Sequence, residues 1–177
     1  MVNLHSPTEW RKTLITFLVG WGVLFTIFFL FFSPHEYRLQ IIEAEHVREL
    51  LNRVGIQTTD GNNPISFWMN GKNIEISPRC TGLIEFILLG TAILATKKHS
   101  LYARIKGIII GIILLYGFNL ARMMVTILQL EHTPLSFAML THDVLFRVLL
   151  IAGFALIYAG WVHRHQIITR LHAQELV

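Results

Sequence analysis

The stretch TLITFLVGWGVLFTIFFLFF, Thr13–Phe32, carries no charged side chain along its whole length. About 20 apolar residues are enough for a helix to cross a hydrocarbon core of roughly 30 Å. Arg11 and Lys12 precede the stretch. The apolar region of a signal peptide is shorter, about 7–15 residues, and is followed by a small-residue cleavage site that is missing here. We therefore expect a retained membrane helix over 13–32.

The composition agrees with a membrane protein. Hydrophobic residues make up 53% of the 177 residues and charged residues 15%. The formal charge of +4 does not indicate nucleic acid as a partner, because no basic stretch is interleaved with aromatic residues. The single cysteine excludes an internal disulfide. A free thiol in such a chain therefore needs an explanation.

Further apolar segments follow the first one. Together they predict one membrane domain over 1–177, an all-α polytopic membrane protein folded as a four-transmembrane-helix bundle. The expected spans are about 13–32, 80–96, 107–130 and 142–161.

Residues 33–79 are polar and are expected to form a small extracytoplasmic insertion. Tyr37–Val54 has apolar residues at helical spacing and predicts an amphipathic helix. Further along, Asn70-Gly71 separates two strand-like runs, 64–69 and 72–76, and this dipeptide is a strong signal for a β-hairpin. The predicted hairpin leads directly to Cys80.

The basic residues predict the orientation in the membrane, since cytoplasmic loops are enriched in Lys and Arg. With four spans, one side has only Glu9 and Glu175 as acids and carries a group of basic residues: Arg11, Lys12, Lys97, Lys98, Arg104, Lys106, Arg164 and Arg170. We expect both termini on the cytoplasmic side of the cell membrane and Cys80 on the other.

Arg122 and Asn119 are unexpected residues for an apolar helix. They lie one turn apart in the third expected span and therefore share a face. An arginine at this depth costs about 2.5–3.5 kcal/mol on insertion scales and usually faces the protein interior or a wet cavity. The structural alternative is an arginine that reaches the interface, or that pairs with Glu85 or Asp143 to hold helices together.

His142, Asp143 and Arg147 open the fourth expected span. Asp143 and Arg147 are spaced four residues apart and can pair along one face, and His142 would lie near the interface. The alternative interpretation makes His142 a capping residue and Arg147 a structural partner of Asp143. Glu85 is a better ion-pair partner for an arginine than a catalytic acid.

Cys80 stands at the start of the second expected span, in the string Ser77-Pro78-Arg79-Cys80-Thr81-Gly82. A thiol at a helix N-terminus lies at the positive end of the helix dipole, which favours the thiolate, and a nearby cation favours it further. A thiolate is the nucleophile that acyl transfer requires. The alternative is an inert, buried cysteine.

Nothing in the chain indicates a metal or cofactor site. The histidines of His163-x-His165 fall at the predicted cytoplasmic end, far from Cys80, and no His-Glu-x-x-His motif or cysteine pair occurs. We therefore expect no metal and no cofactor.

Three short motifs in order resemble the exosortase/archaeosortase family: Cys80-Thr81-Gly82, Asn119-Leu120-Ala121-Arg122 and His142-Asp143. The resemblance covers about residues 78–160. It implies a membrane-embedded cysteine protease or transpeptidase that cuts exported proteins at a C-terminal motif, transmembrane helix and basic tail. The reaction would pass through a thioacyl-enzyme, with transfer to an acceptor such as a membrane lipid.

The resemblance also implies roles for individual residues. Cys80 would be the nucleophile and Arg122 the essential basic residue, while His142, or Arg147 as in archaeal members, would take the third role. Asn119, Asp143 and Glu85 would support them. Two other classes stay open: a small transporter, for which Cys80 would be dispensable, and a non-enzymatic membrane scaffold, for which Arg122→Lys would be tolerated.

Overall fold

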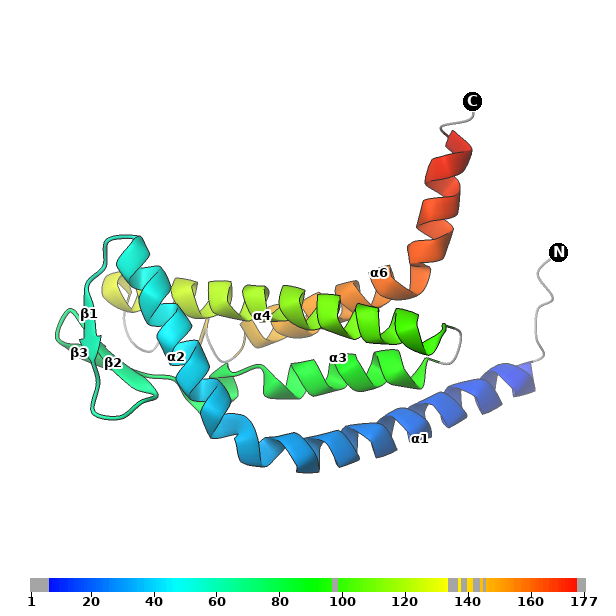
Figure 1. Ribbon diagram of the computed structural model, residues 1–177, viewed down its shortest axis with the longest axis horizontal. Helices are drawn as coiled ribbons and strands as arrows, with labels where there is room; N and C mark the ends of the chain where they lie inside the picture. The colour runs from blue at the N-terminus through cyan, green and yellow to red at the C-terminus, as the bar shows by residue number, and fades with distance from the viewer. Residues whose placement is uncertain are drawn as a thin grey trace.

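The computed structural model is an elongated helical bundle with a small β-sheet at one end (Figure 1). It describes residues 7–96, 99–133, 137, 140, 141, 144 and 146–174, with side chains for 10–96, 99–130, 133, 137, 140, 141, 144 and 147–163. Helices α1, α3 and α4 and the first part of α6 run along the bundle. The helical elements are α1 (Pro7–Phe32), η1 (Ser33–His35), α2 (Glu36–Arg53), η2 (Pro78–Cys80), α3 (Leu83–Ala95), α4 (Leu101–His132) and α6 (Phe146–Gln174).

Pro34 marks the change of direction between α1 and α2. Proline has no backbone N–H to donate, and its ring disfavours a continuous α-helix. The chain passes through the short 3-10 helix η1, which contains Pro34, and then enters α2. Figure 1 shows α2 crossing the end of the bundle at a steep angle and leading to the sheet. The predicted amphipathic helix 37–54 is therefore confirmed.

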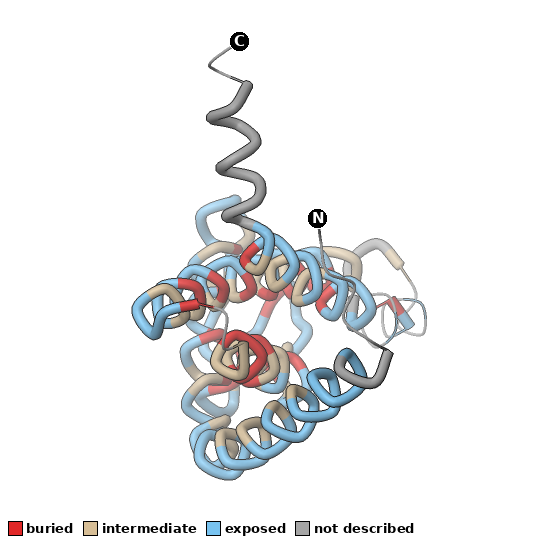
Figure 2. The backbone as a smooth tube through the Cα atoms, turned by 90° about the vertical axis from the view of Figure 1, so that its right-hand side faces the viewer, coloured by how far each residue is buried: buried red, intermediate tan, exposed pale blue. Residues whose placement is uncertain are grey.

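Helix α3 packs against α1, α4 and α6. Buried segments lie toward the middle of the bundle in Figure 2, which looks along it. Gly107 lets α4 approach α6 closely, because a Cβ at this position would collide with the Trp161 ring. Small residues at such contacts are typical of membrane helix packing. This core contains Leu89, Ile93, Leu115, Leu150 and Trp161.

The sheet has three antiparallel strands in the order β1-β2-β3, with bounds Thr58–Asp60, Ser66–Met69 and Lys72–Glu75. The turn between β2 and β3 is the predicted one: Asn70 and Gly71 have φ of 48° and 76°, as a type I′ turn requires. The hairpin prediction is confirmed. Strand β1 was not predicted, and it makes the insertion a sheet rather than a hairpin alone.

A second core joins α2 and the sheet to the last turns of α4. Its buried members come from α2, β2, the segment before η2, and α4, and they include Val47, Leu51, Phe67, Met69, Ile76, Met123 and Ile127. Lys72, at the start of β3, donates a hydrogen bond of 2.7 Å to the carbonyl of Leu130. That carbonyl lies near the C-terminus of α4, where helix carbonyls lack intrahelical partners. The sheet is thus fastened to the end of α4.

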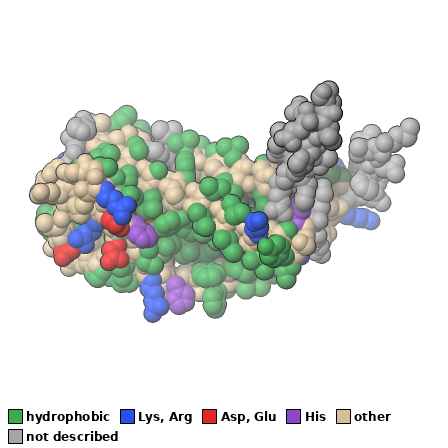
Figure 3. Space-filling view, turned by 45° about the horizontal axis from the view of Figure 1, so that its top comes forward, with side chains coloured by type: hydrophobic (Ala, Val, Ile, Leu, Met, Phe, Trp, Pro, Cys, Tyr) green, Lys and Arg blue, Asp and Glu red, His purple; other side chains and the backbone are tan. Residues whose placement is uncertain are grey.

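Two helical segments, Trp10–Arg53 and Leu101–Leu130, contain stretches long and apolar enough to cross a membrane. Leu83–Ala95 and Arg147–His163 are shorter apolar helices, so two of the four expected spans meet this criterion within the described chain. Hydrophobic atoms cover the middle of the molecule in Figure 3, and the acidic side chains visible there gather toward the end with α2 and the sheet. This distribution fits a membrane protein with a polar end.

We expect Trp21→Phe to weaken the contact between α1 and α3. The Trp21 indole N–H lies 3.0 Å from Thr91 Oγ1 and 3.3 Å from the Leu88 carbonyl. Hydrogen bonds between membrane helices contribute about 0.6 kcal/mol on average and up to about 1.7. Thermal unfolding of the detergent-solubilised protein should show a lower midpoint for Trp21→Phe. Trp10→Phe, at a side chain that is 62% exposed, is the control; equal midpoints for both variants would contradict the assignment.

Candidate active site

Cys80 is the last residue of η2, and the backbone after it changes direction before α3 begins. Ser77 is extended, Thr81 is helical, and Gly82 has φ of +66°, a left-handed conformation that glycine adopts without steric cost. The α-helix starts at Leu83 rather than at Cys80 as expected. Cys80 therefore lies two residues before the N-cap of α3, Gly82, and not in the first turn of that helix.

Two side chains of α4 donate hydrogen bonds to the carbonyl oxygen of Cys80. Asn119 Nδ2 lies 2.9 Å from this oxygen, and Arg122 Nη2 lies 2.8 Å from it. A carbonyl oxygen accepts up to two such bonds, so both of its lone pairs are used. Asn119 and Arg122 are 0% and 5% exposed. The predicted pairing of these residues on one face of α4 thus has a structural purpose: it holds the backbone of Cys80.

Glu43 of α2 is the third partner in this network. Its Oε1 accepts a hydrogen bond of 3.1 Å from Asn119 Nδ2, and its side chain is fully buried. The amide group of Asn119 therefore links Glu43 to the Cys80 carbonyl. Glu43 was not among the site residues predicted from the sequence. One signal was present: Glu43 lies four residues before Val47 and eight before Leu51, both in the buried face of α2.

Glu43 lies in α2, which follows the apolar stretch of α1. Unlike that stretch, α2 carries charged residues along its whole length. Burial raises the pKa of the Glu43 carboxyl to about 9, and the hydrogen bond from Asn119 opposes this change. The carboxyl is therefore protonated at neutral pH. A neutral acid avoids the cost of a buried, unpaired carboxylate.

The same face of α2 touches the segment around Cys80 at two more points. Gln40 Nε2 donates to the Ile76 carbonyl at 2.7 Å, and the buried Thr81 hydroxyl lies 3.4 Å from Glu36 Oε1. Glu36, Gln40 and Glu43 are spaced by four and three residues, which places them along one stripe of the helix. α2 therefore supports the Cys80 turn from one side while α4 supports it from the other.

The Cys80 thiol itself is 8% exposed, and its Sγ lies 3.2 Å from Ser77 Oγ, within hydrogen-bonding distance. The Arg122 guanidinium brings a positive charge next to this residue, because it bonds the Cys80 carbonyl. Placing a cation beside a cysteine favours the thiolate. The structure thus brings a guanidinium and an amide to the backbone of the residue that carries the thiol.

The structure gives less information about the other predicted site residues. Arg147 is exposed, and Glu85 is partly buried near the start of α3. Both charges act on Arg122 through space. Within the part of the chain that the structure describes, no ion pair joins Glu85 to Arg122. His142 and Asp143 lie outside the described residues. Among the described residues, no group of three or more His, Cys, Asp or Glu side chains could hold a metal ion.

Comparison with known families decides the classification. The model of the transmembrane exosortase family (Exosortase_EpsH) matches residues 11–161. The chain belongs to the transmembrane exosortase family. The match includes α1, the insertion, Cys80, Asn119 and Arg122, and it confirms the family that the sequence motifs indicated. No curated protein and no solved structure matches this exosortase-family chain. Family membership indicates, in general terms, a membrane protease or transpeptidase role.

We expect Glu43→Gln to preserve the fold and Glu43→Ala to weaken it. Glutamine keeps the shape and the acceptor oxygen of the protonated acid. Alanine leaves the Asn119 amide short of a buried acceptor, at a cost of about 1–3 kcal/mol. Stability should be measured by thermal unfolding in detergent near pH 7. A larger loss for glutamine than for alanine would contradict the protonated state of Glu43.

The same pair gives a pH test. The folded carboxyl has a pKa of about 9 and holds its proton up to that pH, whereas the ordinary pKa of a glutamate is 4.5. The folded state then binds more protons than the unfolded state between these values, so the contribution of Glu43 to stability decreases as pH rises through this window. Stability of the wild type should fall more steeply than that of Glu43→Gln from pH 5 to pH 9. Parallel profiles would contradict the prediction.

Gly82→Ala should disturb the site. The left-handed φ of Gly82 costs an L-residue about 1–2 kcal/mol, and an added Cβ would lie 3.4 Å from Asn119 Cγ. We expect a lower unfolding midpoint and faster alkylation of Cys80 by a thiol reagent, because the packing over η2 loosens. Gly117→Ala is the control, since nothing lies within 4 Å of an added Cβ there. Equal behaviour of the two variants would contradict the role of Gly82.

Proposed function

We propose that this protein is a membrane cysteine protease or transpeptidase with Cys80 as its nucleophile. It would cleave the C-terminal sorting signal of exported proteins and transfer the new carboxyl end to an acceptor. One observation carries the proposal beyond family membership: Asn119 and Arg122, two residues of the family-like motif, both hydrogen-bond the Cys80 carbonyl. An unrelated use of these polar residues would not require them to converge on this turn.

The reaction would proceed in two steps. The Cys80 thiolate attacks the scissile carbonyl carbon and forms a C–S bond, and the peptide C–N bond then breaks as the leaving amine takes up a proton. The acceptor attacks the resulting thioester, its proton is removed, and the thiolate leaves. The Arg122 guanidinium, near the thiol, stabilises the thiolate. His142 would give a proton to the leaving amine and later take one from the acceptor. Arg147 is the alternative candidate for the third catalytic residue.

The supports around Cys80 suit a nucleophile that has to keep one position. Catalytic groups lose much of their effect when they move by about 1 Å. Here the Cys80 carbonyl is held by two buried donors, and the carbonyl of Ile76, four residues earlier, is held by Gln40. Arg122 therefore has two proposed tasks, to position the backbone and to favour the thiolate, and Asn119 and Glu43 act as positioning residues.

The membrane placement is part of the proposal. Four spans with both termini in the cytoplasm would put η2, α2 and the sheet on the extracytoplasmic side of the cell membrane. The distribution of Lys and Arg along the chain supports this orientation. A sorting signal made of a motif, a transmembrane helix and a basic tail would then present its motif beside Cys80, with its tail in the cytoplasm. A lipid amine or hydroxyl at the membrane surface is the acceptor we propose.

The test is processing of an exported reporter in cells. The reporter carries a C-terminal motif, helix and basic tail taken from the same genome, and its mass is read after co-expression. Wild-type protein should remove the tail, and Cys80→Ala should not. Arg122→Lys retains the charge but loses the planar fork, and we expect processing to fall on the order of 100-fold, as for the loss of one catalytic hydrogen-bond donor.

Arg53→Lys is the matched control, because Arg53 is exposed on α2 and pairs with Glu49 away from Cys80. Its processing should equal that of the wild type. A mass increment on the cleaved reporter would identify the acceptor, and an unmodified carboxyl end would mean hydrolysis. Processing that persists in Cys80→Ala would overturn the nucleophile. Processing that persists in Arg122→Lys would favour the scaffold role for that arginine.

A further inference from the structure

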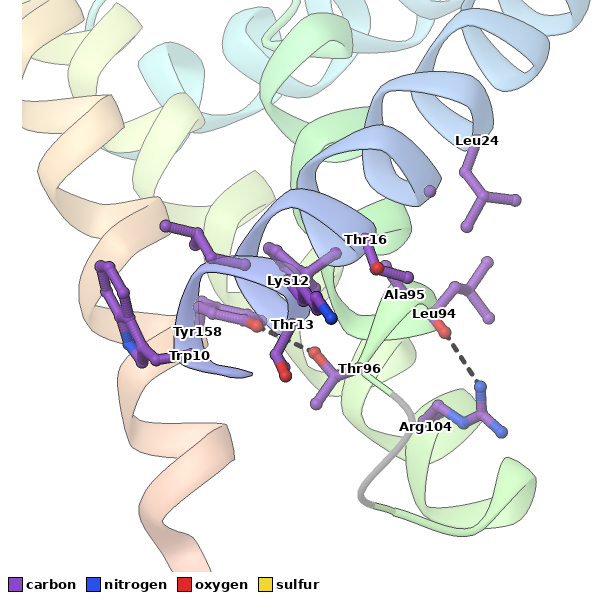
Figure 4. A pocket seen from close by; sticks show the side chains of 13 residues that line it. Trp10, Lys12, Thr13, Thr16, Leu24, Leu94, Ala95, Thr96, Arg104 and Tyr158 are labelled. Carbon is purple, nitrogen blue, oxygen red and sulfur yellow. Dashed lines mark hydrogen bonds between the residues drawn. The ribbon is translucent and has the colours of Figure 1, made fainter. Parts of the chain in front are cut away.

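A second site lies at the end of the bundle away from Cys80. It is a pocket of about 910 Å³ lined mainly by the first half of α1 and the last turn of α3, with Arg104 of α4 and Tyr158 of α6 (Figure 4). The 13 residues of α3 separate it from the Cys80 turn, a distance of about 20 Å along the helix. The pocket is therefore not part of the candidate active site.

One part of this pocket is polar and positively charged. Lys12 comes from α1 and Arg104 from α4, and no acidic side chain is among its lining residues in the described part of the chain. Arg104 Nη1 donates to the Leu94 carbonyl at 2.9 Å, which holds the guanidinium at the rim (Figure 4). Tyr158 and Thr96 hydroxyls, 2.8 Å apart, add polar groups. Among the lining side chains that the structure describes, these two cations have no acidic partner, and this fits an anionic group.

The other part of the pocket is apolar and extends along α1. Phe17, Leu24 and Leu94 line it, and Gly20 contributes no side chain between them. An added Cβ at Gly20 would meet nothing within 4 Å, so the space beside it is open. From Lys12 to Leu24 the helix rises about 18 Å, close to the depth of one membrane leaflet, about half of the 30 Å core.

The pocket has positive charge at one end and an apolar channel about as long as one membrane leaflet is deep. A phospholipid, with a charged head group and acyl chains of that length, matches this arrangement. We infer that this pocket binds one anionic phospholipid, with its phosphate against Lys12 and Arg104 and an acyl chain along Phe17, Gly20 and Leu24. Trp10, which is 62% exposed at the mouth, suits the membrane interface where tryptophan side chains concentrate. A substrate helix with a basic tail fits less well, because its charge would face Lys12 and Arg104. This inference does not rest on the proposed function.

Native mass spectrometry of the full-length protein in detergent tests the head-group contact. The protein is titrated with phosphatidylglycerol or with phosphatidylcholine, and the bound lipid is counted. We expect one phosphatidylglycerol to bind in preference to phosphatidylcholine. Lys12→Gln should weaken phosphatidylglycerol binding about fivefold, the usual effect of one basic residue at a membrane surface. Arg11→Gln is the control, since the neighbouring Arg11 does not line the pocket.

A pair of glycine variants tests the location. Gly20 and Gly22 both have open space around an added Cβ, but of the two only Gly20 lines the pocket. Gly20→Leu should abolish phosphatidylglycerol binding, and Gly22→Leu should leave it unchanged. Equal binding of the two lipids, or equal weakening by Arg11→Gln and Lys12→Gln, would overturn the head-group contact. Unchanged binding in Gly20→Leu would overturn the acyl-chain channel.

Discussion

The structure around Cys80 depends on one backbone oxygen. Gly82 turns the chain left-handed between η2 and α3, and the Cys80 carbonyl is satisfied from another part of the chain. In an apolar environment an unpaired carbonyl costs several kcal/mol, and α4 supplies two donors that remove this cost. Arg122 and Asn119 are thus placed inside an otherwise apolar helix by a need for hydrogen bonds. The position of η2 against α4 follows from that need.

Helix α2 also supports the Cys80 turn, and its Glu43 is the last member of the hydrogen-bond network that runs from Cys80 through Asn119. Asn119 donates to both Cys80 and Glu43, so a charged network partner would have to be compensated elsewhere. A protonated Glu43 ends the network without adding a second buried charge to that of Arg122. The packing of Val47 and Leu51 on the same face supplies the apolar contacts that hold α2 in place. Polar and apolar contacts therefore act together on one stripe of α2.

Much of this architecture could be predicted from local patterns. Three local patterns each predicted one element, and the structure has a helix over 13–32, the helix α2 and the turn at Asn70-Gly71. The patterns were the length of the apolar stretch, the spacing of apolar residues and the Asn-Gly dipeptide. The order of the motifs indicated the family. Strand β1 and the start of α3 could not be predicted in this way, because each depends on contacts between segments distant in sequence. The spacing of Glu43 with Val47 and Leu51 indicates the buried face of α2, but the bond of Glu43 to Asn119, 76 residues away, has no local signal. The same holds for the two donors on the Cys80 carbonyl.

The hydrogen bonds to Cys80 also relate to the order in which the chain is made. Synthesis proceeds from the N-terminus, and segments fold as they become available. Cys80 and Glu43 emerge well before Asn119, which bonds both of them, and before Arg122, which bonds Cys80. These two partners lie 39 and 42 residues beyond Cys80 in sequence. A nascent chain that has inserted α3 but not α4 therefore has a thiol without its fixed turn. The site is assembled only once α4 has entered the bundle, and so a truncated chain cannot carry it.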